Sequence, residues 1–111
     1  MSDCLFCKIV SGEVPGDIVY QDEKILVFKD IYPKAEHHLL LIPKEHYKDL
    51  NEIAESNTEL LSTMMNMVPE IARQQGIGEG YRTILNTGPG GGQVIFHIHI
   101  HILGGSDLPG F

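Results

Sequence analysis

A stretch near the C-terminus alternates histidine with isoleucine, and it restricts the local fold more than any other part of the chain. Residues 96–103 read FHIHIHIL. Successive side chains of a β-strand point to opposite faces, so His97, His99 and His101 would share one face. The isoleucines would share the other face and bury it against a core, and their β-branched side chains favour a strand. The pattern therefore predicts a strand over residues 96–103 with three imidazoles on one face.

Three imidazoles in a row indicate a metal site or phosphate chemistry rather than an ordinary polar strand face. Alternate residues of a strand lie ~7 Å apart, which is wide for chelating one small metal but suits an extended phosphate ester. A neutral imidazole is a nucleophile near neutral pH, and neighbouring imidazoles disfavour each other's charged forms. The central His99 is the natural nucleophile, which would form a phosphohistidine that water then hydrolyses. His101 would contact the phosphate or assist the leaving group.

A glycine-rich segment directly precedes the histidine strand. Residues 88–93 read GPGGGQ, and such a backbone can approach a ligand closely with its amides turned toward an anion. We expect the amides of residues 90–92 and the side chain of Gln93 to hold phosphate oxygens where charge develops. The alternative is a flexible hairpin loop.

The bulk composition restricts the class of protein. A chain of 111 residues fits one domain, and its formal net charge of −7 argues against nucleic-acid or anionic-membrane partners. No apolar run approaches the ~20 residues that cross a bilayer, and the first residues carry no secretory signal pattern, so a cytoplasmic location is expected. Two cysteines make no disulfide framework. Cys4 and Cys7 form a CxxC motif that reads as half a zinc site, a redox pair or two buried thiols.

Periodicity predicts the elements in order. We expect a short helical turn at 6–10, a hairpin from strands 17–21 and 24–29, and an apolar strand at 37–43. A further turn of helix is expected at 49–53. The main helix should begin at Ser56, where Ser56 and Glu59 have capping-box spacing, and should kink near Pro69. A fourth strand follows at 81–87.

This order predicts an α+β domain with a five-stranded, mostly antiparallel meander, one long helix and a short helix, with the helices on one face. A small half-covered sheet leaves an exposed edge, which dimerisation commonly hides.

Two polar positions on these strands bear on the site. Asp30 ends the second predicted strand, where it is either a turn residue or a ligand for hydroxyl groups, and the residues alone favour the turn. His37 and His38 are neighbours on a strand, so at most one of them faces the site.

The chain resembles the histidine triad (HIT) family, whose signature is His-φ-His-φ-His-φ-φ with φ apolar. The likeness extends over ordered blocks along nearly the whole chain, namely CLFCKIVSGEVP, FKDIYP, HLLLIPKEH, ILNTGPGGGQ and HIHIHILGG. Gly104-Gly105 resembles the Hint branch, which hydrolyses purine nucleoside 5′-phosphoramidates and aminoacyl-adenylate-type conjugates, whereas the dinucleotide-hydrolase branch usually has Pro-Arg there. The resemblance implies a single HIT domain over residues 1–111, a homodimer with a continuous sheet, a purine nucleotide substrate and no organic cofactor.

The resemblance also implies roles for individual residues. His99 matches the nucleotidylated nucleophile, His101 the phosphate contact and His97 a partner in the histidine network. Asp30 matches the carboxylate that binds the ribose hydroxyls, against the turn that the residues alone favour. The apolar wall around the base corresponds to Leu5, Phe6, Ile9, Val14, Phe28, Ile31 and Leu40. The phosphate side corresponds to Asn86, Gly91, Gly92 and Gln93.

Microbial relatives in this family often bind a structural zinc, and the matching ligands here are Cys4, Cys7, His38 and His97. We expect His37 and His46 to be surface residues. Two departures stand out, because Val94 occupies a position that is often serine and the tail is short and lacks tryptophan. The alternatives are a dinucleoside polyphosphate hydrolase, a nucleotide-binding adaptor with little turnover, and a zinc-dependent redox or metal-handling protein.

Overall fold

The computed structural model describes residues 3–111. Met1 and Ser2, which belong to the segment expected to carry no secretory signal pattern, lie outside the described residues. The helices are α1 (Leu5–Ser11), α2 (Leu50–Ser56) and α3 (Thr58–Gln74), with a 3-10 turn η1 (Pro89–Gly91). The strands are β1 (Ile18–Gln21), β2 (Ile25–Lys29), β3 (His37–Pro43), β4 (Tyr81–Ile84) and β5 (Ile100–Gly104). Within residues 3–111, no helix combines the length and apolar character needed to cross a bilayer.

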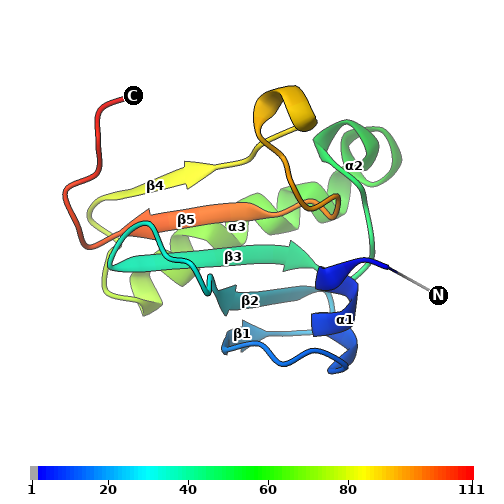
Figure 1. Ribbon diagram of the computed structural model, residues 1–111, viewed down its shortest axis with the longest axis horizontal. Helices are drawn as coiled ribbons and strands as arrows, with labels where there is room; N and C mark the ends of the chain where they lie inside the picture. Colours follow the sequence, from blue (N-terminus) through cyan, green and yellow to red (C-terminus); the bar gives the residue numbers. More distant parts are fainter. Residues whose placement is uncertain (1–2) are drawn as a thin grey trace.

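The five strands form one open antiparallel sheet in the order β1-β2-β3-β5-β4 (Figure 1). The α+β class and the antiparallel pairing were predicted correctly, but the meander was only partly right. The chain follows a meander through β3, continues through α2 and α3, and enters the sheet again at its far edge as β4. The last strand, β5, then inserts between β3 and β4. The histidine strand is therefore central, with a neighbouring strand on each side.

Both faces of the sheet are covered, which corrects the prediction that helices lie on one face. Alternate residues of β2 and β3, such as Val27 and Leu41, point to the face covered by α3 and pack with Met64 and Ile71. The intervening residues, including Phe28 and Leu40, point to the other face, where α1 packs over one end of the sheet (Figure 1). Because α1 covers only part of this second face, the remainder is left open to form a pocket.

Three boundaries differ from those predicted. Helix α3 is capped by the side chain of Asn57, which accepts from the Leu60 amide, while Ser56 ends α2. Pro69 lies inside α3, and β4 ends at Ile84 rather than residue 87. Strand β5 begins only at Ile100, so residues 97–99 precede the ladder. The backbone carbonyls there are consequently available to accept hydrogen bonds from side chains.

The alternation that defined the histidine stretch is nevertheless kept. Ile98, Ile100 and Ile102 are buried in the core under α3. The histidines between them point to the other face, where the rings of His99 and His101 have centroids 5.0 Å apart.

Candidate active site

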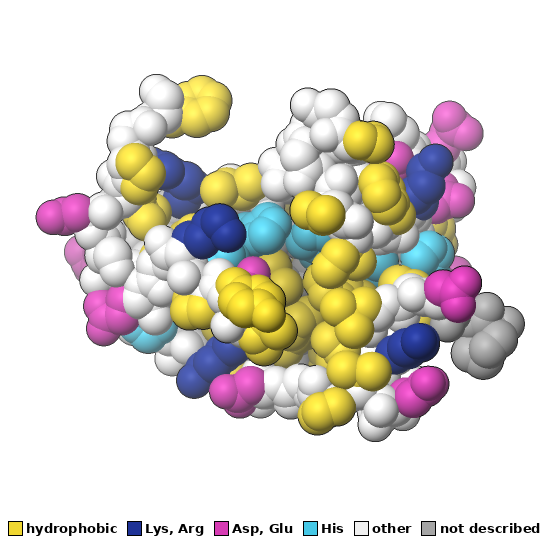
Figure 2. All heavy atoms as spheres, in the orientation of Figure 1, with side chains coloured by type: hydrophobic (Ala, Val, Ile, Leu, Met, Phe, Trp, Pro, Cys, Tyr) yellow, Lys and Arg dark blue, Asp and Glu magenta, His cyan; other side chains and the backbone are white. Residues whose placement is uncertain are grey.

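The open part of the sheet face holds a pocket of about 610 Å³, which is in the range of small-molecule sites. Figure 2 shows this hollow with hydrophobic side chains below a band of histidines. Apolar side chains of α1 line the pocket, and His38, His99 and His101 of the sheet face line it as well. The structure brings all the residues expected for the base wall to this pocket, namely Leu5, Phe6, Ile9, Val14, Phe28, Ile31 and Leu40.

His99 has one ring nitrogen committed to the backbone. Its Nδ1 lies 2.8 Å from the carbonyl oxygen of His97, and since a carbonyl only accepts, Nδ1 carries the proton. The other nitrogen, Nε2, then has the free lone pair in the neutral ring. Burial lowers the pKa of His99, although the bond to His97 and the charge of Asp30 oppose this effect. The Phe6 ring meets His99 edge-on at a centroid distance of 5.1 Å. His99 is therefore buried and oriented, with the Nε2 lone pair of its neutral ring not used by the bond to His97.

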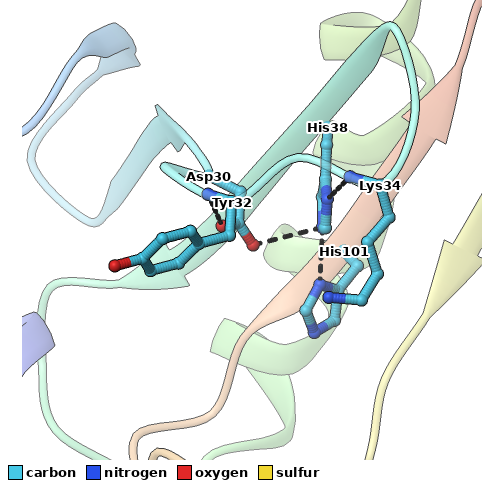
Figure 3. A network of polar contacts seen from close by, with 5 residues as sticks. All are labelled: Asp30, Tyr32, Lys34, His38 and His101. Carbon is cyan, nitrogen blue, oxygen red and sulfur yellow. Dashed lines mark hydrogen bonds and ion pairs between the residues drawn. The ribbon is translucent and has the colours of Figure 1, made fainter.

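His101 is oriented by a chain of two hydrogen bonds that runs from the Lys34 backbone through His38 (Figure 3). The Lys34 backbone N–H donates to Nδ1 of His38 at 3.1 Å, so the proton of neutral His38 is on Nε2. This Nε2 lies 2.9 Å from Nδ1 of His101 and donates to it. The proton of neutral His101 must then be on its own Nε2. His101 is consequently a hydrogen-bond donor at Nε2, next to His99.

The electrostatics keep this network neutral. Burial, followed by the nearby His99 and His38, lowers the pKa of His101 to about 4. Burial also lowers the pKa of His38, and Asp30 opposes this effect.

Asp30 makes a turn contact and also lines the pocket, so its role as a ligand for hydroxyl groups stays a prediction. Its Oδ1 accepts from the Tyr32 amide at 2.8 Å, which is a turn contact, and its Oδ2 lies 3.4 Å from Nε2 of His38. Asp30 also lines the pocket, where a hydroxyl group of a ligand has access to it.

The glycine-rich loop is built differently from the expectation. The amides of Gly91 and Gly92 donate to carbonyls of their own loop at 3.0 Å. The Gln93 side chain is buried and turned inward, where it accepts from Gly88 N–H and donates to the carbonyls of Lys48 and Ile95. The prediction that the Gly91 and Gly92 amides and the Gln93 side chain hold a phosphate is therefore not met in this geometry. These groups instead stabilise the loop through hydrogen bonds within the protein.

Two other groups beside the loop are available to an anion. Val94 lines the pocket, and its backbone N–H makes no hydrogen bond within residues 3–111. The Asn86 side chain also lines the pocket, next to Gly92. Position 94 is often serine in the family, and that hydroxyl is absent here, but the backbone N–H of Val94 can donate to an anion without it.

A second cluster of donor atoms lies at the start of α1. It comprises Sγ of Cys4 and Cys7 and Nδ1 of His46 and His97, all within 4.8 Å of one another. His97 Nδ1 lies 3.3 Å from Cys4 Sγ and 3.2 Å from His46 Nδ1. The expected ligand set is thus corrected at one position. His46 takes the place of His38, because His38 points along the sheet to His101 whereas His46 follows the end of β3 and reaches Cys7.

The cluster has the chemistry of a structural zinc site. Zinc bonds of about 2.0–2.3 Å put tetrahedral donor atoms roughly 3.3–3.8 Å apart, close to the distances here. His97 is fully buried and its Nε2–H donates to the Pro43 carbonyl at 2.8 Å, which leaves the Nδ1 lone pair facing the other three donors. Such an outer bond is typical of metal-binding histidines. The residues therefore fit zinc.

Sequence reasoning missed several pocket residues. Tyr32 and Lys34 line the pocket from the loop between β2 and β3, and Leu103 lines it from β5. No spacing pattern marks the loop residues, because they approach the histidines only through the pairing of β3 with β5.

Known proteins resemble this chain over nearly its whole length. The family model described as "Scavenger mRNA decapping enzyme C-term binding" matches residues 3–110. Protein HitA of Neisseria gonorrhoeae is 51% identical over 94% of this chain and 97% of its own length. The purine nucleoside phosphoramidase of Escherichia coli K12 is 43% identical over 96% and 90%, and the 14 kDa zinc-binding protein of Zea mays is 40% identical over 96% and 85%.

A solved structure agrees with this result. The HIT family hydrolase from Legionella pneumophila Philadelphia 1 superposes with a TM-score of 0.92 at 44% identity, covering 96% of each chain. The chain belongs to the histidine triad (HIT) family. It is a hydrolase of that family.

Proposed function

We propose that this protein hydrolyses purine nucleoside 5′-phosphoramidates, of AMP-amine or aminoacyl-adenylate type, through a covalent nucleotidyl intermediate on His99. The observation that carries the proposal is the hydrogen bond from His99 Nδ1 to the His97 carbonyl, which leaves Nε2 as a lone pair beside the pocket. The E. coli relative named purine nucleoside phosphoramidase supports the substrate class.

The reaction divides into two steps. His99 Nε2 attacks phosphorus and the P–N bond to the amine breaks, while the departing nitrogen accepts a hydrogen bond from His101 Nε2–H and takes its proton from a water molecule. The hydroxide left by that water then attacks the phosphohistidine, and the P–N bond to His99 breaks to release the nucleoside monophosphate. Atoms and protons balance over the cycle. His101 keeps its Nε2–H for this hydrogen bond because His38 occupies its Nδ1 as a donor.

The remaining contacts bind and orient the substrate. The apolar wall under α1 takes the base, and Asp30 Oδ2 accepts from ribose hydroxyls. The Val94 backbone N–H and the Asn86 side chain donate to phosphate oxygens. Gly91, Gly92 and Gln93 act indirectly, since they hold the loop that presents these donors.

The test measures release of amine from an adenosine 5′-phosphoramidate by the wild type and by His99→Ala. We expect the rate of the variant to fall at least 10³-fold, since the covalent route is lost. Denaturing the wild type during turnover should trap the nucleotidyl group on residue 99. Equal rates for the two proteins would refute the mechanism.

We further propose a structural zinc ion held by Cys4, Cys7, His46 and His97. The zinc-binding relative of Zea mays and the donor geometry support it. With four protein ligands the site is closed, so zinc would fix the N-terminus without entering the reaction.

A further inference from the structure

Lys34 is a basic residue at the edge of the pocket that the proposed mechanism does not use. It belongs to the loop between β2 and β3 and lines the pocket with His38 and His101. Its backbone N–H is fixed by the bond to His38, and its side chain extends from there toward His101 (Figure 3). The side chain is exposed, so a ligand in the pocket has access to it.

The ammonium group of Lys34 has no carboxylate partner among residues 3–111. The other lysine that lines the pocket, Lys29, lies 3.9 Å from Asp17, and the pocket carboxylate Asp30 is paired with His38. The protein carries a formal net charge of −7, so the molecule as a whole does not attract an anionic ligand. Any attraction of an anion must come from cations within the pocket, and Lys34 is such a cation.

The position of Lys34 along the histidine row indicates which part of a ligand it meets. The ring centroids of His99 and His101 are 5.0 Å apart, those of His101 and His38 are 5.2 Å apart, and Lys34 is bonded to His38. After burial, the charge of Lys34 is among the causes that lower the pKa of His38 and of His101. For His99 the causes after burial are the His97 bond and Asp30. Lys34 thus lies at the end of the row formed by His101 and His38, away from His99.

In the in-line reaction proposed above, the leaving group departs from the side of phosphorus opposite His99. We propose that Lys34 is a specificity-determining residue that binds an anionic group, a carboxylate, sulfate or phosphate, carried by the leaving group. The protein then prefers nucleoside monophosphoryl conjugates with an acidic leaving group over equally sized neutral ones. The inference rests on the proposed function, because only a hydrolysable conjugate has a leaving group.

The experiment uses two substrates that differ in one charge, the adenosine 5′-phosphoramidates of glycine and of glycinamide. The ratio of their kcat/KM values is measured for the wild type, Lys34→Gln and Lys34→Glu. We expect Lys34→Gln to lower the ratio of glycine to glycinamide conjugate by about three- to fivefold, the usual size of an exposed ion pair. Lys34→Glu should lower it further, and 0.5 M salt should reduce the difference between the proteins.

Lys24→Gln is the matched control, since it makes the same charge change on a lysine that does not line the pocket. It should leave the ratio unchanged. An equal loss for both substrates in Lys34→Gln would place Lys34 on the shared phosphate and overturn the inference, as would no loss at all. Wild-type protein that turns over neither substrate would instead refute the proposed function, and the inference with it.

Discussion

At the scale of single residues, the partner of one ring nitrogen decides what each histidine can do. His97 donates through Nε2 to a carbonyl and faces the cysteines with Nδ1. His99 donates through Nδ1 and keeps Nε2 for attack. His101 accepts at Nδ1 and therefore donates at Nε2. Three residues of the same type in one motif thus become candidates for three roles, namely a metal ligand, a nucleophile and a hydrogen-bond donor to the leaving group.

His38 is a positioning residue in this scheme, and His38→Asn tests it. The asparagine oxygen can still accept the Lys34 N–H, but the shorter side chain does not reach His101, so His101 loses its fixed tautomer. We expect kcat for a phosphoramidate of a basic amine to fall about tenfold or more, because that amine is a poor leaving group and depends on the hydrogen bond from His101 Nε2–H. KM should change little. Steady-state kinetics at pH 7 gives both values.

The leaving group separates this role from a purely structural one. An adenosine 5′-phosphate ester of p-nitrophenol needs no protonation of its leaving group, so His38→Asn should slow its hydrolysis much less. His37→Gln is the control, since His37 is next in sequence but points to the other face of β3. A similar loss of kcat for both substrates would contradict the assignment.

At the scale of elements, α1 connects the cysteine cluster to the pocket. Cys4 caps the helix by accepting from the Cys7 amide at 3.3 Å. The first turn of the helix then supplies Phe6. Its ring centroid lies 6.0 Å from that of His97 and 5.1 Å from that of His99, and both pairs meet edge-on. Phe6 and Ile9 belong to the small apolar cluster on this face of the sheet. The position of the base wall therefore depends on the anchoring of α1 at its N-terminus.

A Cys4→Ser/Cys7→Ser variant removes both thiolates and should lose the proposed zinc. We expect KM for an adenosine phosphoramidate to rise about tenfold, equivalent to ~1.4 kcal/mol of apolar contact, while kcat falls less. Elemental analysis should find one zinc per wild-type chain and none in the variant. Hydrogen exchange of the amides in residues 5–11 should be faster in the variant.

Metal removal and return provide the control. Chelator-treated wild type should behave like the variant and recover with added zinc, whereas the variant should not recover. Unchanged KM and unchanged exchange in a zinc-free protein would exclude the proposed anchoring role.

At the scale of the whole molecule, the sheet leaves strand edges without a partner. Strand β4 pairs only with β5 and β1 pairs only with β2, so each presents one open edge within the described residues. Open edges invite pairing with another chain. We expect a homodimer with a continuous sheet, as the family resemblance implies.

Sedimentation equilibrium tests this expectation directly. The mass should be about twice the 12.3 kDa of one chain at micromolar concentration, and it should decrease toward one chain on dilution if the dimer dissociates. A mass of one chain across the whole concentration range would refute the dimer.

Much of the fold was accessible from local patterns. Alternation in the histidine stretch identified which of its side chains enter the core, and the apolar stripe identified α3. Local patterns failed where distant segments meet. Nothing near residue 100 in the sequence indicates that β5 inserts between β3 and β4, because that position depends on pairing across more than 50 residues.

The same distinction applies to the site. The sequence by itself determined the row of histidines, their common face and the apolar side chains beside them, because a two-residue period requires only a strand-like backbone. Only the tertiary structure decided that His38 joins His101 and that His46 joins the cysteines. In the pairing of β3 with β5, Leu40 lies opposite His101, which makes His38 its diagonal neighbour. Hydrogen bonds across that register then set the tautomers, and no local pattern encodes contacts of such long range.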